Sequence, residues 1–228
     1  MSLLACQCAT ANGLRIKSEA HRSLNGYYIF IHPYFPILPP PDQPPAIDEP
    51  LCYVPDDFEP SSPISLAISS ILALIPHPED AAPTNPHSVS MRRRQAQMFA
   101  EMAMESIEIE SEVLVSATFP AHALSSSPSS FRREGFHVRC PIELESILAY
   151  LVLSIYEYAQ RGNLAKMRNR ASQAHDAATR LSLHDEGENE DGDIKYVEAR
   201  RRAWWMTVNQ QSVSGFDQTL LIRRSTSA

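Results

Sequence analysis

The stretch that decides the fold is Ala171–Trp205, which reads ASQAHDAATRLSLHDEGENEDGDIKYVEARRRAWW. Its first part carries alanines at helical spacing, and its last part ends in the only two tryptophans of the chain, Trp204 and Trp205. Between them, residues 185–193 hold six acidic residues in nine positions, a composition typical of solvated loops. The pattern predicts an amphipathic helix, a polar loop and a second helix anchored by tryptophan.

Proline divides the chain into two halves. All eighteen prolines lie at or before Pro141, and proline disrupts helix interiors because it lacks an amide donor. Residues 142–228 are therefore expected to be almost continuously helical. Apolar residues recur at helical spacing from Leu144 to Tyr158, and Gly162-Asn163 supplies a turn. We expect the next helix to pack antiparallel on this one, because its alanine-rich stripe lets the two axes approach closely.

The first half is expected to contain shorter helices separated by loops. Candidate helices cover 19–32, 63–75 and 88–109. Eleven prolines in 33–63 indicate an extended connector over the surface. A recognition motif for proline-binding modules is the less favoured alternative there. Serines and prolines predict a loop at 120–135.

Together these patterns predict an all-α fold, an irregular helical bundle with a proline-rich surface connector. The expected organisation has a flexible N-terminal segment, one helical domain and a polar C-terminal tail. These parts cover residues 1–18, 19–213 and 214–228.

Composition argues against several classes of protein. The formal net charge of −7 disfavours a surface dominated by nucleic-acid binding. The most apolar run, Ile147–Ile155, is shorter than the ~20 residues of a membrane helix, and no convincing targeting segment is present, so we expect a soluble chain. The scattered cysteines lack the paired spacing of a structural zinc site and fit a reducing compartment. They are Cys6, Cys8, Cys52 and Cys140.

No residue is assigned to catalysis, to a cofactor or to a metal. The seven glycines are spread singly, so no glycine-rich nucleotide loop exists, and Ser212 to Gly215 do not form a nucleophile elbow. His184-Asp185 has the chemistry of a metal pair, but a site needs about three converging ligands, and we expect His175 on a different part of the helix. A helix C-terminal histidine favoured by the helix dipole is the better interpretation. We also expect a structural role for His32.

Two further groups have competing interpretations. The methionines of 88–109 could form an adaptable binding surface, but core packing is favoured; they are Met91, Met98, Met102 and Met104. Arg92–Arg94 precede several glutamates and favour a solvated face over a phosphate clamp. For Arg200–Arg202 we expect pairing with nearby carboxylates such as Glu198, or stacking on the tryptophans, rather than phosphate or nucleic-acid binding.

Three blocks of the sequence resemble the middle regulatory domain of fungal zinc-cluster transcription factors, a domain also described from the xylanolytic activator. The blocks are YYIFIHPYFPIL at 27–38, LSLH at 181–184 and EARRRAWW at 198–205. In that family the second block reads Leu-Gly-Leu-His, and the third reads Glu-x-Arg-Arg-Arg-x-Trp-Trp. The similarity spans about residues 20–212.

The resemblance implies a nuclear regulatory domain without catalytic activity, which tunes transcription by RNA polymerase II through other domains, protein partners or small metabolites. Relatives bind DNA and zinc through a six-cysteine cluster that this chain lacks, so DNA binding is not transferred and no cofactor is expected. The acidic residue that often follows the double tryptophan is unmatched, because Asn209 and Gln210 stand in that region. The implied function is that of a regulatory fragment.

Two other functions stay open. A stand-alone helical module could pair with full-length relatives, as a homo- or heterodimer, which predicts exposed apolar helix faces. A small-molecule-binding helical protein would need a pocket with convergent polar groups. We expect Trp204 and Trp205 at an internal seam, less buried here than in a complete relative.

Overall fold

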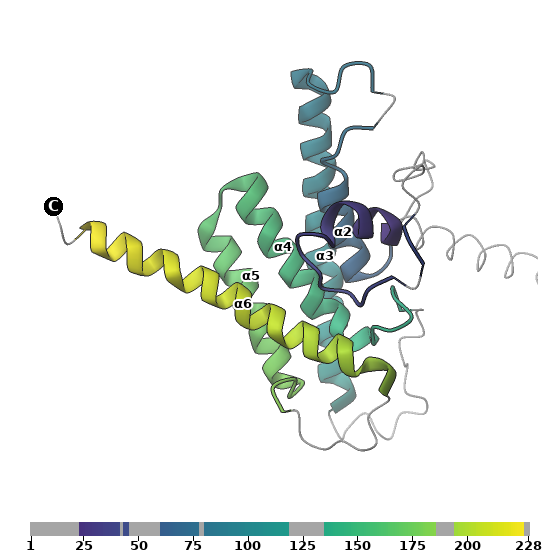
Figure 1. Ribbon diagram of the computed structural model, residues 1–228, viewed down its shortest axis with the longest axis vertical. Helices are drawn as coiled ribbons and strands as arrows, with labels where there is room; N and C mark the ends of the chain where they lie inside the picture. Colours follow the sequence, from purple (N-terminus) through teal and green to yellow (C-terminus); the bar gives the residue numbers. More distant parts are fainter. Residues whose placement is uncertain are drawn as a thin grey trace, which may run out of the picture.

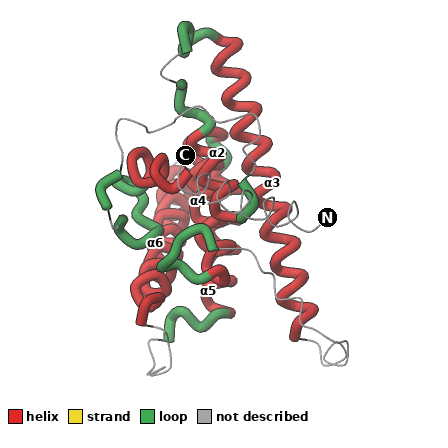
Figure 2. Tube along the Cα trace, turned by 90° about the vertical axis from the view of Figure 1, so that its right-hand side faces the viewer, coloured by secondary structure: helices red, strands yellow, loops and turns green. Residues whose placement is uncertain are grey.

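The computed structural model describes residues 23–41, 43–45, 60–77, 80–118, 135–185 and 194–225. All regular secondary structure in these residues is helical (Figure 2), which confirms the predicted all-α fold. Four expected segments lie outside or largely outside the described residues. They are the flexible segment 1–18, much of the connector 33–63, the loop 120–134 and the acidic run 186–193.

The helices follow the predicted order (Figure 1). A helical turn at 23–26 continues into the short π-helix η1 (Tyr27–Ile31), and η3 (Ile142–Leu144) is a 3₁₀ turn. The longer helices are α2 (Pro63–Leu72), α3 (Pro86–Thr118), α4 (Glu145–Arg161), α5 (Leu164–Arg180) and α6 (Ile194–Ser225).

Two helices run further than their sequence patterns predict. Helix α3 continues past residue 109 to Thr118, and no proline interrupts the chain between Pro86 and Pro120. Helix α6 continues through most of the expected polar tail to Ser225. The only glycine in that extension, Gly215, weakens a helix but does not block it as proline does.

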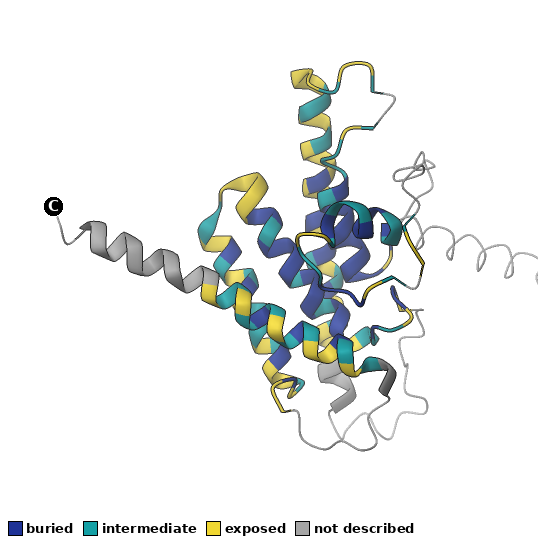
Figure 3. Ribbon diagram, viewed as in Figure 1, coloured by how far each residue is buried: buried dark blue, intermediate teal, exposed yellow. Residues whose placement is uncertain are grey.

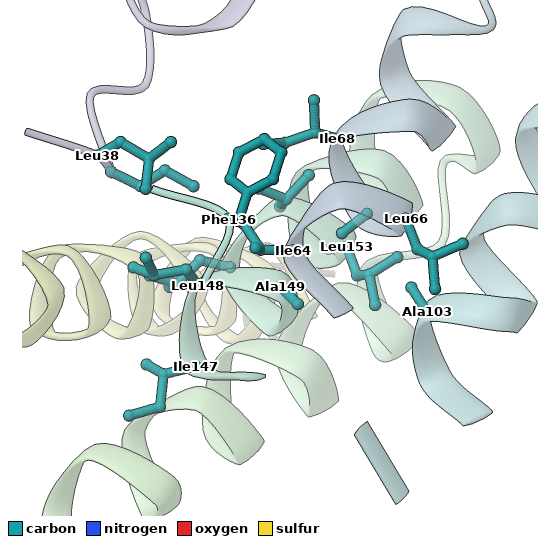
Figure 4. Packing of buried hydrophobic residues seen from close by; sticks show 14 of the residues in the cluster. Leu38, Ile64, Leu66, Ile68, Ala103, Phe136, Ile147, Leu148, Ala149 and Leu153 are labelled. Atoms are coloured by element: carbon teal, nitrogen blue, oxygen red, sulfur yellow. The ribbon is translucent and has the colours of Figure 1, made fainter. Parts of the chain in front are cut away.

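Helix α2 lies at the centre of the bundle, between α3 and α4 (Figure 4). Every residue of α2 except Ile71 is buried, including its three serines. Its start is closed by a capping box, in which Ser62 and Ser65 each accept a hydrogen bond from the other's backbone amide, at 3.2 and 3.1 Å. Ile64 and Ile68 are fully buried, and each contributes roughly 1.5–3 kcal/mol by leaving water.

The remaining helices extend this core in one direction. Helix α4 contacts α2 on one side and α5 on the other, and α5 in turn contacts α6. Most of α4 is buried, whereas α5 and α6 each bury one narrow face (Figure 3). The buried face of α5 is the predicted small-residue stripe, composed of Met167, Ala171, Ala174 and Ala178. The predicted packing of α5 on α4 is confirmed.

A defined turn follows each of the helices α4 and α5. Gly162 adopts a left-handed conformation, with φ of 59°, and closes α4. Asn163 then caps α5 by accepting a hydrogen bond from the Lys166 amide at 3.0 Å. At the far end of α5, Ser182 also has a positive φ, of 52°, and the Leu183 amide donates to the Ala178 carbonyl at 3.1 Å.

The core-facing side of α3 differs from our prediction. Core packing was favoured for the methionines, yet Met91 and Met98 are about half exposed, at 53% and 49%. The buried face is formed instead by residues one step around the helix, which are Ala96, Phe99, Ala100, Ala103 and Ile107. Alanines permit a close approach of α3 to α2. Met102 and Met104 are partly buried and pack against the core as predicted, whereas Met91 and Met98 lie outside it.

The two left-handed positions give a matched test of stability. Gly162→Ala should lower the free energy of unfolding by about 1 kcal/mol, because a Cβ disfavours positive φ. No atom lies within 4 Å of the added Cβ, so the effect should come from the backbone alone. Ser182→Gly should raise stability by about 0.5–1 kcal/mol for the same reason. Urea denaturation measures both, and changes of the same sign would contradict the assignment.

Candidate functional site

Three blocks of the sequence, the third of which belongs to α6, meet along that helix. They are Tyr27–Leu38, Leu181–His184 and Glu198–Trp205, and we call their junction the block seam. The segment after η1 reaches α6 at Pro36, whose carbonyl accepts a hydrogen bond from Arg202, and α5 packs beside the same helix (Figure 1). These are the three blocks on which the family resemblance rests.

Arg202 connects two of the blocks. Its Nη1 donates to the Pro36 carbonyl at 3.1 Å, and its Nη2 donates to Glu198 Oε1 at 2.7 Å. Arg201 donates to the other oxygen of the same carboxylate at 2.6 Å. The predicted pairing of these arginines with Glu198 is therefore confirmed, and the hydrogen bond from Arg202 holds the pKa of Glu198 below its usual range against the opposing effect of burial.

The third block reaches the second through Trp204. The indole stacks on the ring of His175, with centroids 5.3 Å apart, and also contacts the ring of His184 at 5.6 Å. Arg200 Nη2 lies 3.4 Å from the Leu181 carbonyl, a long hydrogen bond between the same segments. His175 lies within α5 and His184 after its end, and the turn at Ser182 folds His184 back so that both rings contact the same indole.

The two tryptophans have different surroundings. Trp204 is partly buried and packs against the core, whereas Trp205 is 54% exposed. Adjacent positions on a helix point about 100° apart, so only one of them can face the seam. The aromatic anchor of α6 is Trp204 alone.

The proline-rich segment has a short buried stretch between residues that are exposed or half-buried. Ile37 and Leu38 are fully buried, and in this stretch alone the structure differs from the predicted surface connector. Prolines cannot donate backbone hydrogen bonds, so neighbouring carbonyls need side-chain donors. Tyr28 donates to the Pro39 carbonyl at 2.5 Å, and Arg139 donates to the carbonyl of Pro40.

Tyr27 fixes the start of this segment. Its hydroxyl donates to the Phe35 carbonyl at 3.2 Å and accepts from the Leu38 amide at 3.0 Å. The same hydroxyl lies 3.1 Å from His32 Nδ1. Burial raises the pKa of Tyr27, and burial, followed by the positive charge of Arg202, lowers the pKa of His32. His32 is thus part of the seam, as its predicted structural role suggests.

A chain of hydrogen bonds links this segment to the residues before α4. The Arg139 amide donates to His137 Nδ1 at 3.1 Å, so the proton of the neutral ring lies on Nε2. That nitrogen contacts the Tyr28 hydroxyl at 3.1 Å, and the hydroxyl donates onward to Pro39. The sequence offered one signal for this contact, an aromatic pair directly before a proline-rich segment, but no signal pointed to His137 or Arg139.

An open groove of about 310 Å³ lies between α3 and the corner of α4 and α5. Glutamates of α3 line one wall, and basic residues of α4 and α5 line the other. The glutamates are Glu101, Glu105 and Glu108, and the basic residues are Arg161, Lys166 and Arg170. Glu157 lies within ion-pair distance of Arg161 at 3.4 Å and of Lys166 at 4.0 Å. The basic wall therefore already has an internal carboxylate partner.

Within the described residues, no three histidine, cysteine or acidic side chains are placed to share a metal ion. Cys140 is buried, and burial raises the pKa of its thiol, followed by the nearby charges of Glu145 and Glu143. No described helix has the length and apolarity required to cross a membrane. No family model, curated protein or solved structure matches the chain.

Removing the Tyr28 hydroxyl should measure how much its contacts with the proline-rich segment and with His137 stabilise the fold. Tyr28→Phe deletes the group that contacts both Pro39 and His137, and loss of a partner for buried polar groups costs about 1–3 kcal/mol. Tyr34→Phe is the matched control, because Tyr34 is 88% exposed and should change stability by less than about 0.5 kcal/mol. Equal unfolding midpoints for the two variants would contradict a stabilising role of the Tyr28 hydroxyl.

The lowered pKa of His32 predicts a pH dependence of stability. The folded state favours the neutral ring, so this contribution is present above the ordinary histidine pKa of 6.5 and is lost as pH falls below it. The stability difference between the native chain and His32→Gln should therefore shrink or reverse between about pH 7.5 and pH 5. His87→Gln, on the exposed start of α3, is the control; a constant difference for His32→Gln would oppose the assignment.

Proposed function

We propose that this chain is a regulatory domain fragment of a fungal transcription factor, which acts in the nucleus and carries no catalytic activity. The observation that carries this proposal is the convergence of the three family-like blocks at the block seam. Arg202 bonds the third block to the first, at Pro36, and Trp204 packs the third against the second, at His184. A domain that acts by contacts with other proteins depends on its shape. Its most recognisable sequence blocks are therefore expected to be the ones that hold its fold together.

The conformation of Ser182 adds support for the resemblance. This residue stands where the family pattern has glycine, and its φ is 52°. A left-handed position that ends a helix is the position that glycine occupies most readily. The family's Leu-Gly-Leu-His pattern thus fits the turn that brings His184 back to Trp204.

The proposed domain acts by contacts rather than by chemistry. With a net charge of −7, the chain relies on a separate module for DNA binding, and zinc belongs to that module. Its described surface offers apolar residues for protein contacts, among them Trp205 on α6 and Met98 on α3. Partners are other domains of a transcription factor or separate regulatory proteins.

A second function is favoured by one observation. The alternative of a helical module that pairs with relatives predicts exposed apolar helix faces, and α3 presents Met91, Met98 and Ile109 at about half exposure. Such exposure is compatible with a regulatory fragment as well, since both functions require a docking surface.

A reporter assay tests the regulatory role. The chain is placed between an unrelated DNA-binding domain and an unrelated activation domain in yeast, and reporter output is compared with that of an unstructured spacer of equal length. We expect the folded chain to reduce output severalfold by contacting the activation machinery. Trp204→Ala, which removes the indole of the block seam, should move output toward that of the spacer.

Trp205→Ala is the matched control, because it removes the same side chain from an exposed position on the same helix. Immunoblots establish equal protein levels, and nuclear fractionation tests localisation of the chain without the fused domains. The proposal fails if the native chain behaves like the spacer, or if the two tryptophan variants give the same output.

A further inference from the structure

Helix α3 carries a largely exposed stripe beside its buried face. The stripe alternates steps of four and three residues, the spacing of a coiled-coil seam. We call it the α3 stripe; it consists of Met91, Gln95, Met98, Met102, Glu105 and Ile109. Met91, Met98 and Ile109 are 53%, 49% and 48% exposed, and Met102 is partly buried.

Most of the stripe lies off the core-facing side of α3. At 100° per residue, Met98 and Ile109 lie about 140° and 120° around the α3 cylinder from Ala103, which is fully buried against the bundle. Helix α3 also lies along one edge of the molecule (Figure 2). A second helix could therefore approach this face without displacing any described element.

The stripe is complementary to itself in the antiparallel direction. A pairing centred on Ala100 places Met98 opposite Met102 of the other copy and Met91 opposite Ile109. The polar positions also coincide, with Gln95 opposite Glu105. In this register, four of the six layers pair two apolar residues, and the other two pair Gln95 with Glu105.

The charges beside the stripe follow the same symmetry. Arg94 flanks its N-terminal half, and Glu108 occupies the equivalent flanking position in the C-terminal half. An antiparallel copy places each Arg94 on the same side of the seam as the Glu108 of the other copy, as an oppositely charged pair. Because the arrangement has two-fold symmetry, the favourable pair occurs twice.

We propose that the α3 stripe is a homodimer surface, and that its occupant is the α3 helix of a second copy in antiparallel orientation. This inference stands independently of the transcriptional role. Methionine side chains adapt readily to such an interface. Glu101 lies nearest the two-fold axis, where it faces its own symmetry mate, and its hydrogen bond from Gln97 at 2.8 Å only partly offsets that repulsion.

Sedimentation equilibrium of the purified full chain provides the first test. The mass should rise from one to two copies with concentration, and Met98→Glu should abolish the rise by placing two charges at the centre of the interface. The control is Tyr158→Glu on α4, a substitution at an apolar residue that is 58% exposed, and it should leave the dimer intact. A chain that stays monomeric at about 0.1 mM overturns the proposal.

A charge exchange tests the register without removing apolar surface. Arg94→Glu and Glu108→Arg should each weaken the dimer, by about tenfold for two pairs of exposed charges. The double variant R94E/E108R should recover most of the native affinity, and Glu101→Gln should tighten the dimer. Circular dichroism establishes that each variant is folded. Additive losses in the double variant would overturn the antiparallel register.

Crosslinking then identifies the pairing directly. Cys6, Cys8 and Cys52 are replaced by serine, and buried Cys140 is retained. A mixture of Met98→Cys and Met102→Cys chains should crosslink between unlike chains with a short thiol-reactive linker. Preferential crosslinking between identical Met98→Cys chains indicates parallel pairing and overturns the proposal, as does a dimer that crosslinks at neither position.

Discussion

The fold depends on the enclosure of α2. Every residue of this ten-residue helix except Ile71 is buried, so other helices must cover it on nearly all sides. Helix α3 covers one side and α4 the other, and this places segments from both halves of the chain around one core. The capping box at Ser62 and the prolines that bound α2 keep it short enough for two helices to enclose.

The enclosure of α2 determines how the helices pack at both edges of the bundle. On one edge, α3 turns its alanines, Phe99 and Ile107 toward the core, and Met91, Met98 and Ile109 are left about half exposed. On the other edge, α5 and α6 add successive layers through narrow faces of small residues. The seam beside α6 is then closed by polar contacts, because the proline-rich segment that fills it has carbonyls without amide partners of their own.

Helix order, the α4–α5 hairpin and the arginine–carboxylate pairs could be predicted from sequence, because periodicity, turn residues and local charge determine them within a few residues of each other. The face of α3 that turns toward the core could not be predicted from sequence. Its methionines and its alanines both form apolar stripes, and only the close approach to α2 decides between them. Similarly, the contact of Tyr28 with His137 joins residues 109 positions apart, so no local pattern could indicate it.

The block seam also explains how a chain can resemble a family without any assigned catalytic residue. Arginine, tryptophan and a left-handed turn are costly to replace when each satisfies a partner in a distant segment. Arg202 serves Pro36 and Glu198 together, so its loss would leave a carbonyl and a carboxylate without that donor. Such residues preserve a shape rather than a reaction. A protein that acts by presenting surfaces would concentrate its recognisable sequence in the contacts that hold those surfaces in place, and the surfaces themselves, such as the α3 stripe, would then be free to differ between relatives with different partners.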